Sequence, residues 1–593
     1  MGDYREVICD VLVVGGGGAG FRAAIGAREK GLNVTLLSKG PLARCGASPM
    51  AGADFTLDGN SMNMLGREGD INDSKEKVFN DIVTQGWYLN NQRLVGQYVE
   101  TAPLLLKDLI DWGVDIKISD QRMIFTSGTG IMDVLLKRAR SVGVKLIEDV
   151  ALLELTKADG RITGGLGLDI RSGEFIHFLA KAVVIATGGW HKGFWPNTGM
   201  RDLSGEGIAM AHRAGADIGN MEFITFCCNV FYEPPMWMGS IAPYMLSLIC
   251  GGRLTNNLGE DILKEYDPYV VQVGTFTEWN KSFISLATMK EVRDGRGLKN
   301  GGVHYQRGDA SWDFINMVAS IVFPNWKYKA IDLSSWAAML ENDIPVEVGP
   351  AVEYFDGGII VNERFETGVG GLFAAGECTL GAFGANRVFS AITEMLVHGK
   401  DAGENAADYA KDKEISRPDT DIIMSIKEGA EKPLSRRDGI SPPKLRREIQ
   451  IRAHRKLGPI RNKEELEGFI DFLKGIREDK LKDLATAGKG RIYNKEWLDA
   501  LELPNIVHLL LSAAKCALLR TESRGVHYRE DYPVTDNDNW MVESIVKHSG
   551  DGDFEIGARQ VSADVMTLPK GKVPYLDMMK KMMEAHSDTG GKH

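Results

Sequence analysis

The segment from Cys9 to Gly40, CDVLVVGGGGAGFRAAIGAREKGLNVTLLSKG, is the feature that most constrains how this chain can fold. A short β-branched run, VLVV, leads directly into glycines at positions 15, 17 and 20, the spacing of a G-x-G-x-x-G motif. An alanine-rich helix face and a second apolar run, VTLLS, follow. Strand, tight turn, helix and strand in this order predict a dinucleotide-binding fold, because the glycines let backbone amides approach a pyrophosphate at a helix N-terminus.

The glycine motif alone does not choose between NAD and FAD, since the second strand ends in Ser38 and Lys39 rather than in a ribose-binding acid. Two later segments, AVVIATGG (182–189) and GLFAAGEC (371–378), are strands that end in glycine. Late strands that return to an N-terminal nucleotide fold suit a large two-part cofactor such as FAD. Glu377 is then a candidate for binding ribityl or ribose hydroxyls.

Bulk properties exclude several classes of protein. A chain of 593 residues is expected to form two to four domains, and its net charge of -11 argues against a nucleic-acid binder. No apolar run approaches the ~20 residues of a membrane span, so we expect a cytoplasmic protein that meets a membrane only through partners. The seven cysteines are scattered without a C-x-x-C pair, which predicts neither a disulfide framework nor a metal or iron–sulfur site in this chain.

Several longer segments resemble the flavoprotein subunit of succinate dehydrogenase and fumarate reductase, and the resemblance covers nearly the whole chain. The segments are ATGGWHKGFWPNT, SGEGIAMAHRAGADIGNMEF, GGRLTNNLGEDILKEYDP, KEVRDGRG, YFDGGIIV, GLFAAGECTLGAFGANR and RTESRGVHYREDYPVTDNDNW. The last is the most specific. The resemblance implies an α/β fold in which a Rossmann-like FAD-binding domain (1–225 and 350–410) carries an inserted α+β capping domain (226–349). A helical domain (425–540) and a C-terminal tail (541–593) follow.

The resemblance also implies which residues contact FAD. Glu206 stands where the family usually has an aspartate, and Ile392 and Thr393 stand where it has Ser-Leu at the flavin ring. Family members often tether FAD through a histidine, but that position is Gly46 here, so we expect non-covalent FAD. The full set of expected FAD contacts is Gly15, Gly17, Gly18, Gly20, Ser38, Lys39, Gly52, Val150, Thr187, Gly188, Glu206, Glu377, Ile392 and Thr393.

The resemblance also implies a substrate pocket in which the family's hydride-transfer chemistry is retained but several of its residues are replaced. Arg387, in GANR, matches the arginine that clamps a substrate carboxylate, a task that suits its rigid fork. The proton-shuttle arginine falls on Lys281, and the two histidine positions fall on Cys227 and Glu353. A glutamate facing an acidic substrate is repulsive unless it is protonated or paired, for example with Lys281 or Arg387. Cys227 and its neighbour Cys228 have three interpretations: pocket lining, ordinary buried cysteines, or a reactive thiol or vicinal disulfide.

These features predict an FAD-dependent oxidoreductase that transfers hydride between the flavin and a C=C or CH–CH unit of a small-molecule acid other than plain fumarate. A true fumarate reductase or succinate dehydrogenase with a divergent clamp is one alternative. A flavin subunit like that of adenylylsulfate reductase is another, and a non-catalytic electron-transfer flavoprotein is a third. Because this chain lacks cluster ligands, the expected electron-transfer partner is an iron–sulfur subunit.

Overall fold

The computed structural model describes residues 4–51, 54–116, 118–120, 122–200, 202–266, 281–307, 310–315, 333–387, 389–549 and 554–587. Its organising element is a five-stranded parallel sheet with the strand order β18-β11-β2-β3-β7. The strands are β2 (Val11–Val14), β3 (Val34–Leu37), β7 (Lys145–Ile147), β11 (Ala182–Ile185) and β18 (Leu372–Ala374). One sheet therefore joins a strand that begins at Val11 to a strand that ends at Ala374. This arrangement confirms the predicted mixed α/β fold.

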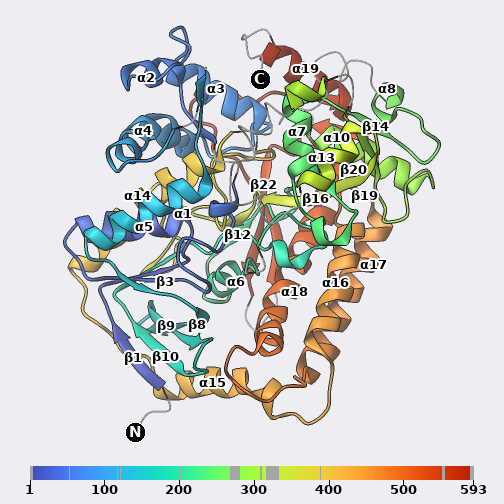
Figure 1. The fold of residues 1–593 in the computed structure, drawn as a ribbon. Helices are drawn as coiled ribbons and strands as arrows, with labels where there is room; N and C mark the ends of the chain where they lie inside the picture. Colours follow the sequence, from blue (N-terminus) through green and yellow to red (C-terminus); the bar gives the residue numbers. More distant parts are fainter. Residues whose placement is uncertain are drawn as a thin grey trace.

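Two helices pack closely on this sheet through small residues. They are α1 (Gly18–Glu29) and α14 (Ala391–Lys411), which lie side by side in Figure 1, with α5 (Gly128–Ser141) next to α1. A Cβ added at Gly403 would come within 2.0 Å of the Ala23 carbonyl oxygen, and one at Gly399 within 2.5 Å of the Ala19 oxygen. Only glycine permits backbones to approach this closely, so the two helices are held in one relative position.

The rest of the nucleotide-binding region consists of smaller elements around this sheet. One four-stranded sheet contains β1 (Tyr4–Ile8), β8 (Val150–Ala158), β9 (Arg161–Asp169) and β10 (Phe175–Leu179). A small sheet contains β4 (Asp54–Thr56), β5 (Ile118–Asp120) and β6 (Met123–Phe125). The accompanying helices are α2 (Gly59–Met64), α3 (Lys75–Gln85), α4 (Gln92–Asp111) and α6 (Glu206–Arg213).

A second unit lies above one side of the nucleotide-binding region (Figure 1, green). Its antiparallel sheet has the order β13-β16-β15-β14, formed by Ile224–Phe231, Val346–Phe355, Val303–Gln306 and Arg253–Thr255 respectively. The helices are α7 (Ala242–Cys250), α8 (Ile262–Tyr266), α10 (Lys281–Arg293) and α13 (Leu333–Glu341). Its two long strands cross the predicted capping-domain boundaries at 226 and 349, so continuous strands connect this unit to the rest of the fold.

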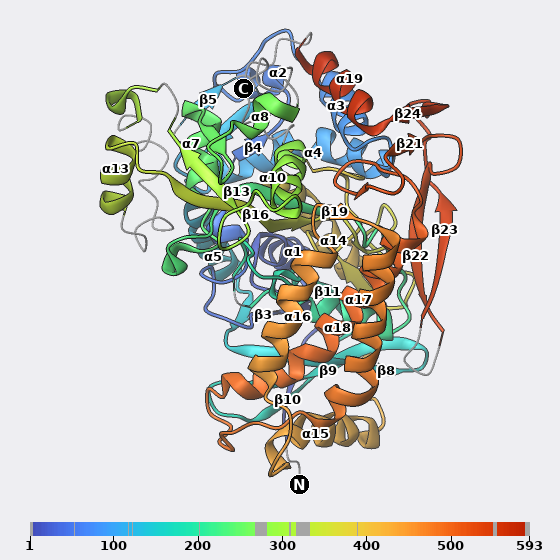
Figure 2. The same ribbon diagram turned by 90° about the vertical axis from the view of Figure 1, so that its right-hand side faces the viewer.

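Long helices fill the lower part of the molecule in Figure 2: α15 (Thr420–Ser435), α16 (Pro442–Lys456), α17 (Lys463–Gly475) and α18 (Lys495–Leu519). Among the described residues, α18 alone is long and apolar enough to span a membrane by length and composition. Its longest apolar stretch, IVHLLLSAAKCALL, is short and interrupted by a lysine. Since 72% of its apolar window is buried inside the protein, α18 packs as a core helix here.

The C-terminal region joins the main body through strands. β22 (Val542–His548) pairs with both β23 (Phe554–Gln560) and β12 (Ile218–Gly219), and β12 pairs in turn with β17 (Gly358–Ile359). The β22–β23 hairpin forms one edge of the molecule in Figure 2. Shorter pairs join β19 (Ile460–Arg461) to β20 (Tyr528–Arg529) and β21 (Val534–Asp536) to β24 (Lys572–Pro574), before α19 (Tyr575–Ser587).

The RTESRG segment forms a buried ionic network at the centre of the molecule. Arg520 donates to Glu222 (2.7 Å) and to Glu522 (3.0 Å), and Arg524 donates to the same Glu522 oxygen at 2.8 Å. All four side chains are fully buried. Buried charges are tolerated only when they are paired and hydrogen-bonded, so this network accounts structurally for the most specific sequence signature of the chain.

Removing one charge from this network should destabilise the fold strongly. We expect Glu522→Gln to lower the free energy of unfolding by about 3–5 kcal/mol, because two buried arginines lose a shared counter-ion. Urea unfolding of the FAD-loaded protein, followed by circular dichroism, measures this change. The control is Asp111→Asn, which breaks an exposed ion pair with Lys107 and should cost less than about 1 kcal/mol. Equal effects of the two substitutions would contradict a central role for the network.

Candidate functional site

The turn between β2 and α1 has the shape of a phosphate cradle. Gly15 has a φ of +127°, and a Cβ there would meet the Ala186 oxygen at 2.1 Å. A Cβ on Gly20 would lie only 1.8 Å from the Gly15 oxygen. Beside Gly17, by contrast, the nearest atom to such a Cβ is Ser48 Oγ at 3.3 Å. The turn is thus closed by backbone atoms at Gly15 and Gly20, whereas at Gly17 the near atom is the Ser48 hydroxyl, at the helix N-terminus where phosphates bind.

The start of α14 lies next to this turn. A Cβ on Gly18 would meet the Met395 methyl group at 2.3 Å, and Ser48 Oγ contacts Met395 Sδ at 3.3 Å. Ser390 caps α14 by accepting a hydrogen bond from the Thr393 amide, and Thr393 Oγ1 accepts one from the Thr56 amide. Ile392 and Thr393, expected at the flavin ring, are therefore buried at a helix N-terminus directly beside the predicted pyrophosphate site.

The residues after β3 enter a network of buried charges. Lys39 pairs with Glu206 at 2.8 Å and with Glu502 of α18 at 3.0 Å, and it donates to Ser204 Oγ. Burial opposes the lysine charge, but the two glutamates outweigh it and raise the pKa of Lys39 above its ordinary value. The neighbouring Ser38 carbonyl accepts from the Val150 amide. Ser38, Lys39, Val150 and Glu206 thus lie together, and Glu502 joins them from 463 positions away in the sequence.

The residues after β11 and β18 form the other side of the cradle. The Gly189 amide donates to Glu377 at 3.2 Å, and His191 Nε2 lies 3.7 Å from the other Glu377 oxygen. Among the described residues, Thr187 Oγ1 and Glu377 Oε1 are buried oxygens without a hydrogen-bond partner. Buried polar atoms normally have one, so both await a ligand such as a cofactor hydroxyl or amide. The residues present therefore fit FAD, while Gly52 lies outside the described residues.

Gly46 sits in a loop where a side chain has space. Its φ is +76°, no atom lies within 4 Å of an added Cβ, and its amide donates to Asp202 at 2.9 Å. The adjacent Cys45 is buried, and burial together with the Asp202 charge raises the pKa of its thiol to about 11. Neither residue therefore offers a ready nucleophile for attaching a cofactor.

Lys281, Glu353 and Arg387 form a compact charged cluster, named here the charge triad. Lys281 Nζ donates to Glu353 Oε2 at 2.7 Å, and Arg387 Nη2 lies 3.7 Å from the same oxygen. The exposed fractions of the three side chains are 2%, 16% and 12% in that order. The structure thus brings together three of the four predicted catalytic residues, from the start of α10, from β16 and from the loop before α14.

Irregular strand pairing supplies one member of the triad. The register between β13 and β16 shifts between Thr225 and Phe226, so Tyr354 and Val352 are paired while Glu353 between them is not. Such bulges commonly re-aim a side chain beside an active site. Cys227 lies on the facing strand, paired with Ala351, and is fully buried in the apolar cluster of the capping unit. Cys227 therefore lies on the strand next to the one that carries Glu353, and its role stays a prediction.

Aromatic rings flank both cations of the triad. The Tyr244 ring lies 4.7 Å from Lys281 Nζ, and the Tyr354 ring lies 5.0 Å from the Arg387 guanidinium. The Tyr354 hydroxyl donates to Glu394, whose other oxygen accepts from the Ala382 amide. These contacts are favourable for cations removed from water, and they fix the ring on which the Arg387 guanidinium rests.

Two further buried carboxyl groups lie within reach of the Arg387 charge. Burial raises the pKa of Glu394 to about 7 and that of Asp356 to about 7, and the Arg387 charge partly opposes both shifts. Asp356 also accepts from Thr225 Oγ1 at 2.8 Å. Glu394, Asp356 and Tyr354 are not among the site residues predicted from the sequence. Tyr354 and Asp356 lie in the YFDGG segment, whose resemblance was a signal for them, and Glu394 has no such signal.

The loop that carries Arg387 is held by backbone hydrogen bonds from distant segments. The Ala385 amide donates to the Gly86 oxygen, and the Val526 amide donates to the Ala385 oxygen. Asn90 donates to the Ala382 oxygen at 2.6 Å. Because two distant parts of the chain, 86–90 and Val526, fix this loop, the guanidinium is held in place before any substrate binds.

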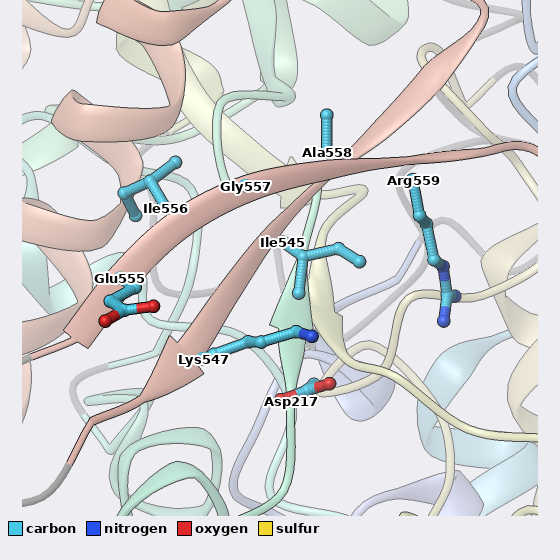
Figure 3. Close-up of a pocket in the computed structure, with 8 residues that line it drawn as sticks. All are labelled: Asp217, Ile545, Lys547, Glu555, Ile556, Gly557, Ala558 and Arg559. Atoms are coloured by element: carbon cyan, nitrogen blue, oxygen red, sulfur yellow. The ribbon is translucent and has the colours of Figure 1, made fainter.

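A metal site and a surface groove are two other kinds of candidate site. The described residues contain no group of three or more His, Cys, Asp or Glu side chains that could hold a metal ion. A surface groove of about 400 Å³ lies along β22 and β23 and is shown in Figure 3. It is lined by Asp217, Ile545, Lys547, Glu555, Ile556, Gly557, Ala558 and Arg559, none of which belongs to the cofactor cradle or the charge triad.

Comparison with known families matches most of the chain. A model of the FAD binding domain matches residues 10–124 and 117–391. A model of the fumarate reductase flavoprotein C-terminus matches residues 446–575. Together these matches span the glycine turn, the charge triad and the RTESRG segment of the buried network.

Individual relatives match over nearly their whole length. A fumarate reductase (CoM/CoB) subunit of Methanothermobacter marburgensis is 29% identical, over 89% of this chain and 95% of the relative. The solved Mycobacterium smegmatis Sdh1 in complex with UQ1 is 27% identical, with a TM-score of 0.82 and 95% coverage of both chains. Adenylylsulfate reductase of Archaeoglobus fulgidus has a TM-score of 0.76 at 20% identity and 96% and 97% coverage, a likeness in fold alone.

The close approach at Gly20 gives a direct test of the cradle. We expect Gly20→Ala to purify with less than about a tenth of the wild-type FAD, because its methyl group displaces the Gly15 carbonyl from the turn. The absorbance ratio of flavin to protein measures the loss. Gly96→Ala is the control, since nothing lies within 4 Å of a Cβ at this position in α4, and it should keep full FAD content. Normal FAD content in Gly20→Ala would contradict the assignment.

Proposed function

Because this chain belongs to the family of succinate dehydrogenase and fumarate reductase flavoprotein subunits, which are FAD-dependent oxidoreductases, we propose that it reduces the C=C bond of a small acid, or catalyses the reverse reaction. The resemblance inferred from the sequence segments and the FAD cofactor are thereby confirmed. The charge triad is the observation that carries the proposal. It combines an anion-binding guanidinium with a proton-bearing ammonium group, on the fold that binds FAD.

In this proposal each member of the triad has its own task. Bound FAD supplies or accepts the hydride, which is its ordinary chemistry. Arg387 binds the substrate carboxylate through two parallel N–H groups, and its fixed loop orients the double bond. Lys281 gives a proton to the carbon next to the one that receives hydride, acting as general acid. Glu353 keeps Lys281 positioned and returns a proton to it after each turnover.

The balance of the reduction is simple. The π bond of the substrate breaks and two C–H bonds form, with both electrons arriving as hydride and the proton arriving from the Lys281 ammonium group. The electrons come from an iron–sulfur partner subunit, which is the partner that we propose. Relatives with which the chain aligns over nearly its full length are named as subunits, which supports a complex of this kind. We place the protein in the cytoplasm, with any membrane contact made through partners.

Fumarate reduction itself is the second candidate. The 29% identity with the fumarate reductase (CoM/CoB) relative favours it, since that relative aligns along almost its full length. The two candidates share the fold, the cofactor and the type of reaction. They differ in whether the substrate is fumarate or another small acid.

We further propose that FAD is bound without a covalent link. Gly46 has no side chain that could form one, and the buried Cys45 holds its proton because its pKa is about 11. After precipitation of the purified protein with trichloroacetic acid, the yellow flavin should appear in the supernatant. Flavin that stays in the pellet and fluoresces on a denaturing gel would contradict the proposal.

Lys281 as the proton donor gives the most specific prediction. Lys281→Met should slow reoxidation of the reduced enzyme by substrate at least about 100-fold, the usual contribution of a general acid. Binding of substrate, read from the flavin absorbance, should weaken by less than about tenfold because Arg387 is unchanged. Lys290→Met, on the exposed end of the same helix, is the control and should behave as wild type. Turnover of Lys281→Met within a few-fold of wild type would place the donor elsewhere.

A further inference from the structure

The charge triad limits how much negative charge a substrate can bring. Lys281 and Arg387 carry two positive charges, and both lie against the same oxygen of Glu353. The three side chains together therefore carry one net positive charge. Since ions that leave water need near-complete neutralisation, one substrate carboxylate balances this cluster and a second does not.

Acidic groups near Arg387 reduce the positive charge available to a substrate below that of the charge triad alone. Glu377, Asp356 and Glu394 are buried carboxyl groups whose ionisation responds to the Arg387 charge. Any of them that ionises offsets the guanidinium charge, and none adds a positive charge. The nearby His191 faces Glu377 and gives its Nε2 contact to the Glu353 carbonyl oxygen. The described groups behind Arg387 thus favour a substrate with little charge.

Lys281 also contacts an aromatic residue of a buried apolar cluster. The Tyr244 ring lies against Lys281, and Tyr244 belongs to a buried cluster with Cys227, Phe283 and Trp237. The order of contacts runs from Arg387 to Glu353, then Lys281, then Tyr244. A substrate whose carboxylate rests on Arg387 and whose reacting carbon lies near Lys281 extends towards the Tyr244 ring, where a charged group would lose its hydration.

We propose that the substrate of this site is a monoanion, an unsaturated monocarboxylic acid or the half-ester of a dicarboxylic acid with an uncharged far end, and that Glu353 disfavours dicarboxylates because it cancels one of the two positive charges that a dianion needs. This inference rests on the proposed function and narrows it to one substrate class. It assigns Glu353 a second task besides positioning Lys281, namely selection between mono- and dianionic acids.

Fumarate and monomethyl fumarate form a matched pair of probes, since they share a carbon skeleton and differ by one charge. Each is mixed with dithionite-reduced, FAD-loaded enzyme, and flavin reoxidation is followed. We expect kcat/KM for the half-ester to exceed that for fumarate at least about tenfold, which corresponds to about 1.4 kcal/mol. In Glu353→Gln the ratio of kcat/KM for the half-ester to kcat/KM for fumarate should fall by about tenfold or more. An equal or greater wild-type rate with fumarate would overturn the inference.

A matched control and a binding measurement complete the test. Glu363→Gln removes an exposed carboxylate that pairs with Arg93, and it should leave the substrate ratio unchanged. If neither acid reoxidises the flavin, the proposed reaction fails, and the charge inference is decided by binding instead. Monomethyl succinate should then perturb the flavin spectrum at a lower concentration than succinate. Tighter binding of succinate, or no response to either compound, would overturn the inference.

Discussion

One carboxylate shared by two cations holds the candidate site together. Glu353 Oε2 accepts from Lys281 at 2.7 Å and lies 3.7 Å from Arg387. Without Glu353, two cations that are almost entirely removed from solvent would repel each other. Without the cations, the carboxylate would face the cost of an unpaired charge in a largely buried position. The anion-binding group and the proton-bearing group therefore remain adjacent because each depends on the same counter-ion.

The scaffold explains how residues so far apart in the sequence meet. A bulge in the β13–β16 pairing leaves Glu353 outside the regular register, α10 begins at Lys281, and hydrogen bonds from Gly86 and Val526 fix the loop before Arg387. Strands β13 and β16 run across the predicted domain boundaries at 226 and 349, so the sheet that carries Glu353 continues directly into the neighbouring parts of the chain. Pre-positioned groups of this kind reduce the entropic cost of reaching the transition state.

The sequence predicted those parts of the structure that depend on local patterns. The glycine turn and the strands at AVVI and LFA followed from spacing and from resemblance. The sequence left open whether Glu353 is protonated or paired with a cation, and the structure shows the pairing with Lys281. The sequence did not predict the ion pair between Lys39 and Glu502, which joins residues 463 positions apart, nor the pairing of β22 with β12. It also gave no warning that Glu394 is buried and has a pKa of about 7, because this shift arises from tertiary burial.

The most direct test of the whole account is a crystal structure of the FAD-loaded enzyme with monomethyl succinate, the saturated half-ester. The account predicts electron density for one carboxylate paired with Arg387, for the central carbons beside Lys281 Nζ, and for the ester group on the Tyr244 side. A carboxylate that instead approaches Glu353, or a ligand bound away from all three residues of the triad, would contradict it.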